Sequence, residues 1–70
     1  MIPLQYAEVG ESQIIRKIGG SPDVQQHLRD LGFNVGSEVQ IISTLAGNLI
    51  VKVRESRIAV SQELARKIMV

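Results

Sequence analysis

The sequence predicts a mainly β domain in which a small barrel carries one short helix, at about residues 22–31, and a C-terminal helical turn. Short stretches rich in β-branched and alternating residues recur along the chain, at 12–18, 38–45, 49–54 and 57–61. Glycines separate several of these stretches, and 70 residues are too few for a two-sheet sandwich. Closing the sheet into a barrel also removes the exposed edges that promote aggregation.

Composition limits the classes of function. We expect a single domain spanning 1–70, with 44% hydrophobic but only 3% aromatic residues and therefore an aliphatic core. The chain has no cysteine, which excludes disulfides and thiolate metal sites. A net charge of +1 gives little attraction to nucleic acid or to an acidic membrane surface. No apolar run approaches the roughly 20 residues that cross a bilayer, so we expect a cytoplasmic protein without membrane insertion.

The first strand region, 12–18, does not alternate strictly. Ile14 and Ile15 are neighbours in sequence, so a regular strand would point them to opposite faces. This spacing predicts a bulge or an exchange of faces before Gly19-Gly20 ends the strand.

Start and stop signals bracket the predicted helix. Ser21 is suited to the N-cap, and Pro22 to the first helical position, where its missing amide has no intrahelical partner. Gly32 can adopt the positive φ that ends a helix, and Phe33 can then contact Leu28 across a Schellman cap. We expect the narrow apolar face of this helix to seal one end of the barrel.

The next two strands are predicted to form a hairpin, and its loop decides which residues face the core. A three-residue loop, Ala46-Gly47-Asn48, pairs Leu45 with Leu49 and keeps both apolar faces together. A two-residue Gly47-Asn48 turn would instead place Lys52 in the core. We therefore expect the three-residue loop, with Asn48 in the left-handed conformation.

The C-terminal part predicts a second hairpin and a closing helical turn. Glu55-Ser56 is expected at the hairpin tip, with a strand at 57–61 after it. Ser61 can cap a helical turn over 62–67, and Met69-Val70 adds a short strand. Short strands, tight turns and limited length together predict an SH3-like barrel.

The chain as a whole resembles the ferrous iron transport protein A (FeoA) family. The resemblance depends on the order and spacing of Gly10, Ile15, Ile18, Leu28, Leu31-Gly32-Phe33, Gly36, Val39, Ile58-Ala59-Val60, Ala65, Ile68 and Val70. It implies an SH3-like domain that is also similar to the C-terminal domain of iron-dependent transcriptional repressors. It further implies a bacterial cytoplasmic accessory protein that is not an enzyme and that contacts the G-protein-containing ferrous iron permease. The alternative is a metal-responsive or nucleic-acid-associated regulatory module.

The only candidate metal ligands lie on the predicted helix, where Asp23, His27 and Asp30 fall within one arc of roughly 60°. A histidine and two carboxylates could form a weak three-ligand site. The simpler interpretation is that Asp23 complements the helix dipole and that the other two residues are solvated. We expect no cofactor and no catalysis, because no nucleophile or P-loop pattern accompanies the single histidine.

A small docking patch for a protein partner is the more specific functional expectation. Ile42 and Ile50 are predicted to point away from the core, with Thr44 opposite Ile50. With Tyr6 they could form an exposed apolar area of the kind that marks interaction sites. The alternative is that the N-terminal segment or the last helical turn covers them.

Overall fold

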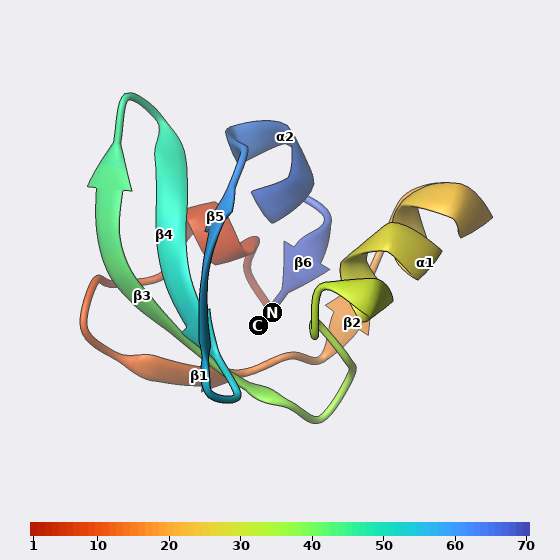
Figure 1. Cartoon of the computed structure of the whole chain (residues 1–70), viewed down its shortest axis with the longest axis horizontal. Helices are drawn as coiled ribbons and strands as arrows, with labels where there is room; N and C mark the ends of the chain where they lie inside the picture. Colours follow the sequence, from red (N-terminus) through yellow and green to blue (C-terminus); the bar gives the residue numbers. More distant parts are fainter.

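Two antiparallel sheets build the barrel of the computed structural model, which describes all residues, 1–70 (Figure 1). One sheet has four strands in the order β1-β3-β4-β5, and the other pairs β2 with β6. The elements in chain order are η1 (Leu4–Tyr6), β1 (Ser12–Ile14), β2 (Lys17–Ile18), α1 (Pro22–Asp30), β3 (Glu38–Leu45), β4 (Asn48–Val53), β5 (Ser56–Val60), α2 (Gln62–Ala65) and β6 (Ile68–Met69). The predicted mainly β fold with one short helix and a C-terminal helical turn is confirmed.

The strand region predicted at 12–18 is divided between the two sheets. Its first part, β1, pairs with β3, whereas its second part, β2, pairs with β6. Ile15 lies between the two parts and is fully buried, while Ile14 is 44% exposed. The broken alternation therefore marks the point at which the chain passes from one sheet to the other.

Capping interactions define α1 as predicted. The Ser21 hydroxyl oxygen accepts a hydrogen bond from a first-turn amide at 3.3 Å. At the other end, Gly32 has a φ of +108°, and its amide donates to the carbonyl of Arg29 at 2.9 Å. The Phe33 amide donates to the carbonyl of Leu28 at 2.9 Å, which completes the Schellman pattern. Leu28 and Phe33 are both fully buried, so the cap is part of the core.

The β3–β4 hairpin differs from the prediction in its loop. The turn has two residues, Ala46 and Gly47, with φ values of 52° and 85°, and Leu45 lies opposite Asn48. Asn48 is therefore the first residue of β4 and does not adopt the left-handed conformation. Leu45 does not face the core as expected and is 68% exposed.

A register shift between Ile41 and Ser43 compensates for the shorter loop. One extra residue in β3 restores the phase, so that Ile41 still pairs with Val51 and Lys52 stays outside the core. The shift lies just beyond the end of the pairing between β1 and β3, next to a hydrogen bond of 2.8 Å from the amide of Gly10 to the carbonyl of Ile41. Beyond this point β3 pairs only with β4 and can bend.

The C-terminal half follows the prediction with small shifts in its boundaries. The second turn is Arg54-Glu55, one residue earlier than expected, because Val53 lies opposite Ser56. The Ser61 hydroxyl oxygen accepts a hydrogen bond from the Leu64 amide at 3.2 Å, as expected of an N-cap. Helix α2 then ends at Ala65 instead of extending to residue 67.

The core is aliphatic around a single aromatic ring. Its 13 buried residues are Leu4, Ile15, Leu28, Phe33, Val39, Ile41, Leu49, Val51, Val53, Val60, Ala65, Ile68 and Val70. The two ends of the chain lie side by side (Figure 1), where Ile2 and Val70 exchange backbone hydrogen bonds of 3.0 and 2.9 Å. None of the helices has the length and apolar character needed to cross a bilayer.

Candidate partner-binding surface

The outer face of the β3–β4 hairpin carries the central residue of the predicted patch. Ile50 lies between Ser43 of β3 and Ala59 of β5. It faces away from the core because its neighbours Leu49 and Val51 both point inward. The side chain is half-buried on this outer face.

The observed register exchanges the predicted positions of Thr44 and Leu45. Thr44 pairs with the core residue Leu49, not with Ile50, so it lies on the inner side at the rim of the barrel. Leu45 pairs with Asn48 and therefore lies on the outer face, diagonal to Ile50. The prediction that Thr44 lies opposite Ile50 was wrong because it did not include the bulge in β3.

The apolar residues of this face form a surface that we call the hairpin patch, consisting of Ile42, Leu45 and Ile50. Ile42 lies at the bulge and is half-buried. Tyr6 is 68% exposed but lies on η1, which packs against α2. The structure therefore places Tyr6 on a different element from the other three predicted residues.

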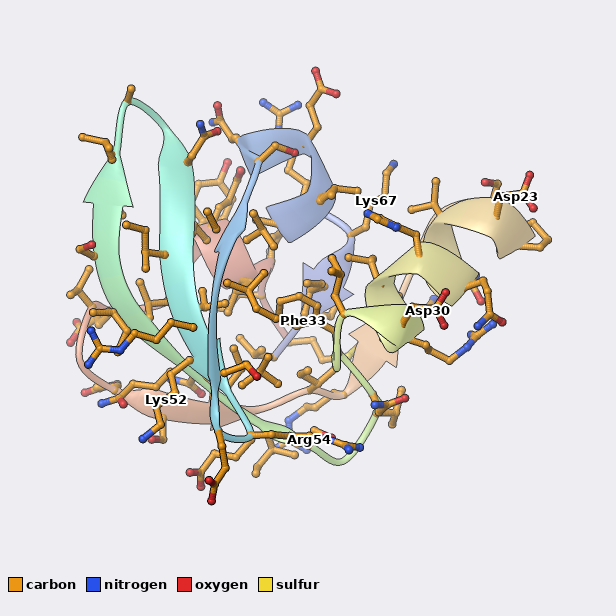
Figure 2. The ribbon with its side chains drawn as sticks, in the orientation of Figure 1. Asp23, Asp30, Phe33, Lys52, Arg54 and Lys67 are labelled. Carbon is orange, nitrogen blue, oxygen red and sulfur yellow. The ribbon has the colours of Figure 1, made fainter.

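A polar hollow of about 270 Å³ lies at the other end of the same hairpin. Its lining residues are Ser37, Glu38, Gln40, Lys52 and Arg54. Figure 2 shows Lys52 and Arg54 at the end of the hairpin opposite the Ala46-Gly47 turn. The Gln40 side-chain amide donates to the carbonyl of Gly10 at 2.8 Å, so it helps to attach β3 to the N-terminal segment. The outer face is thus apolar near one turn and charged near the other.

The structure does not gather the three candidate metal ligands of α1. No group of three His, Cys, Asp or Glu side chains is placed to hold a metal ion. Asp23 and Asp30 lie near opposite ends of the helix (Figure 2), about 10 Å apart along its axis from the helical rise. The Asp30 carboxylate already accepts a hydrogen bond from Gln26 at 2.8 Å. Sharing one face of a helix did not bring these groups within reach of a single ion.

Comparisons with known protein sequences agree on one protein family. Residues 2–70 match the model of the FeoA domain family. A protein of Methanocaldococcus jannaschii, whose name describes it as a candidate Fe(2+) transport protein A, is 39% identical over 70 residues. The match covers 100% of this chain and 85% of that protein.

Solved structures show the same fold. An iron uptake regulatory protein (FeoA) has a TM-score of 0.87 at 27% identity, over 96% of this chain and 89% of that chain. The zinc complex of Stenotrophomonas maltophilia FeoA, described as a procaryotic SH3 domain protein, has a TM-score of 0.84 at 21% identity, over 99% and 88% of the two chains. A manganese-dependent transcriptional repressor has a TM-score of 0.87 at 15% identity, over 96% of this chain and 34% of the repressor. The last two likenesses concern the fold alone.

Proposed function

Because this chain belongs to the FeoA domain family, a family of non-enzymatic proteins associated with ferrous iron transport, we propose that it acts by binding the G-protein-containing ferrous iron permease. In this proposal the contact takes place in the cytoplasm, on the cytosolic domain of the permease. The family match over residues 2–70 carries this proposal, because it includes every element of the domain.

The hairpin patch is the surface that we assign to this contact. Leu45 is a large apolar side chain at the tip of a hairpin, and 68% of it is exposed. Ile42 and Ile50 extend the apolar area along the hairpin, and Lys52 and Arg54 follow at its charged end. An apolar centre with a charged margin is the usual composition of a protein–protein interface.

Backbone amide shifts of the labelled chain, recorded with and without the cytosolic domain of the permease, test the proposal. We expect the largest changes at the hairpin patch and their loss in a Leu45→Asp variant, because a carboxylate would be desolvated at the interface. Val35→Asp is the matched control, since Val35 is 64% exposed and lies in the loop before β3. Equal binding by both variants would show that the hairpin patch is not the contact surface. No binding by the unmodified chain would contradict the proposed contact with the permease.

Two further substitutions separate the residues of the predicted patch. Thr44→Ala should bind normally, because Thr44 lies on the inner side of the hairpin rim. Tyr6→Ala should also bind normally if the contact is confined to the hairpin, because η1 packs against α2. Loss of binding in either variant would extend the surface toward the N-terminal segment.

The regulatory-module alternative has only the likeness of fold to a repressor in its favour. It requires affinity for DNA that falls steeply as salt is raised. Titration of a mixed-sequence duplex at two salt concentrations distinguishes the two functions, and we expect no binding at either one.

A further inference from the structure

A second hollow of about 270 Å³ lies at the opposite side of the barrel from the hairpin patch, next to the start of α1. We call it the basic pocket, and its lining residues are Lys17, Gly19, Gly20, Arg66, Lys67 and Met69. Three of these side chains are cations and none is acidic, although the chain as a whole has a net charge of only +1. The cations come from two segments far apart in sequence, one at β2 and one between α2 and β6.

Pairing between β2 and β6 places two of the cations on one face. Lys17 lies opposite Met69 in this ribbon, and the Gly19 amide donates to the carbonyl of Lys67 at 2.7 Å. Side chains alternate along a strand, and Ile68 is fully buried, so its neighbour Lys67 lies on the outer face together with Lys17. The backbone thus fixes both cations on the same side of the ribbon.

The glycines keep the space between these cations open. Gly19 occupies the outer face without a side chain, and Gly20 follows it with a φ of +95°. A Cβ on Gly20 would lie 3.0 Å from the Cδ of Lys67 and 3.0 Å from a methyl group of Val24. The stem of Lys67 therefore passes close to Gly20, near the first turn of α1 (Figure 2).

The positive charges of the basic pocket are not used within the chain. The side-chain hydrogen bonds formed by the protein involve other residues, and none includes Lys17, Arg66 or Lys67. Because no acidic residue lines the pocket, an incoming anion has no competitor there.

The adjoining helix argues against a phosphate as the natural ligand. Phosphate sites at helix starts depend on several free backbone amides. In α1, the Ser21 hydroxyl already accepts from the Val24 amide, Pro22 has no amide hydrogen, and Asp23 places a negative charge in the first turn. The attraction comes instead from flexible side chains around an open hollow, an arrangement that suits carboxylates presented by another protein chain.

We propose that the basic pocket receives the carboxylates of an acidic segment of a protein partner. The assignment is independent of the hairpin patch, which lies on the other sheet and would bind through apolar contacts. Both surfaces can be occupied at once, because the pocket lies beside β6 and the start of α1, on the opposite side of the molecule from β3 and β4 (Figure 1).

Titration of the labelled chain with a hexaglutamate peptide tests the proposal. We expect amide shifts centred on Gly19, Gly20 and Lys67, and a Kd that increases as sodium chloride is raised. The double variant Lys17→Gln and Lys67→Gln should bind roughly tenfold more weakly, from the loss of two exposed ion pairs. The control Arg29→Gln and Arg57→Gln removes the same charge from exposed residues of α1 and β5 and should leave the Kd unchanged.

Several outcomes would overturn the assignment. Equal weakening by the two double variants would mean that the peptide responds only to net charge. Stronger binding of inorganic phosphate or of duplex DNA at the same amides would identify a different ligand class. Weaker binding by the Lys17 and Lys67 variant with unchanged thermal unfolding would instead support the assignment, because the loss of binding would not result from unfolding.

Discussion

The Ala46-Gly47 turn predicts that a single exposed substitution will stabilise the protein. Ala46 is exposed and has a φ of 52°, in the left-handed region, which costs an L-residue with an ordinary side chain about 1–2 kcal/mol. Asparagine tolerates this region, and Asn-Gly is the preferred pair for a two-residue hairpin turn with two positive φ values. We expect Ala46→Asn to raise the free energy of unfolding by about 1 kcal/mol.

Thermal unfolding followed by circular dichroism measures this effect directly. For a domain of this size, a gain of 1 kcal/mol corresponds to a rise in Tm of roughly 4–8 °C. The matched variant is Asn48→Thr, which should change Tm little, because Asn48 is an exposed strand residue opposite Leu45.

The alternative three-residue loop predicts the opposite pattern. If Asn48 occupied the left-handed position, a β-branched residue there would destabilise the protein by about 1–2 kcal/mol. Ala46→Asn would then bring no gain. A lowered Tm for Asn48→Thr together with an unchanged Tm for Ala46→Asn would refute both the turn and the bulge derived from it.

Three other substitutions have defined effects on the free energy of unfolding, measurable by urea titration. Gly32→Ala should lower the free energy of unfolding by about 1–2 kcal/mol, because Gly32 has a φ of +108°. The nearest side-chain atom would lie 3.6 Å from the added Cβ, so the destabilisation comes from the backbone conformation and not from a steric clash. Ser21→Ala should lower the free energy of unfolding by about 1 kcal/mol through loss of the N-cap, and Ser21→Asp should retain stability. Gln5→Met should raise it by about 1 kcal/mol, because the buried Oε1 of Gln5 has no hydrogen-bond partner; an unchanged value would show that this oxygen is hydrated.

Local signals explain why α1 could be predicted closely. Its boundaries depend on groups within one or two turns of each other, such as Ser21 at the start and Gly32 at the end. The same holds for Ser61 and α2. These interactions do not require knowledge of which strands are neighbours.

The hairpin register could not be predicted, because its cause is not local. The alternation of inward-facing and outward-facing side chains predicts that Leu45 pairs with Leu49, but this prediction holds only if β3 has no bulge. The bulge arises where the N-terminal segment stops pairing with β3, marked by the hydrogen bond from Gly10 to Ile41. As a result, the predicted docking patch included Thr44, which lies on the inner side of the hairpin, and omitted Leu45, which lies on the outer face.

The candidate sites could not be predicted for a similar reason, because they depend on distances and strand pairings that the sequence does not show directly. The metal hypothesis used the angular spacing of Asp23, His27 and Asp30 but not their separation along the helix axis. The basic pocket was not predicted, although both Arg16-Lys17 and Arg66-Lys67 are visible in the sequence. Only the pairing of β2 with β6 shows that Lys17 and Lys67 share a face.

The hydrogen bonds between Ile2 and Val70 have a practical consequence for protein engineering. Because the two ends are adjacent, a short peptide could join them, and the chain could be reopened elsewhere without stretching the sheet. The exposed Arg54-Glu55 turn is a suitable site for such a circular permutant. For the same reason, the domain can be inserted as a cassette into a loop of a host protein with little displacement of the host's flanking strands.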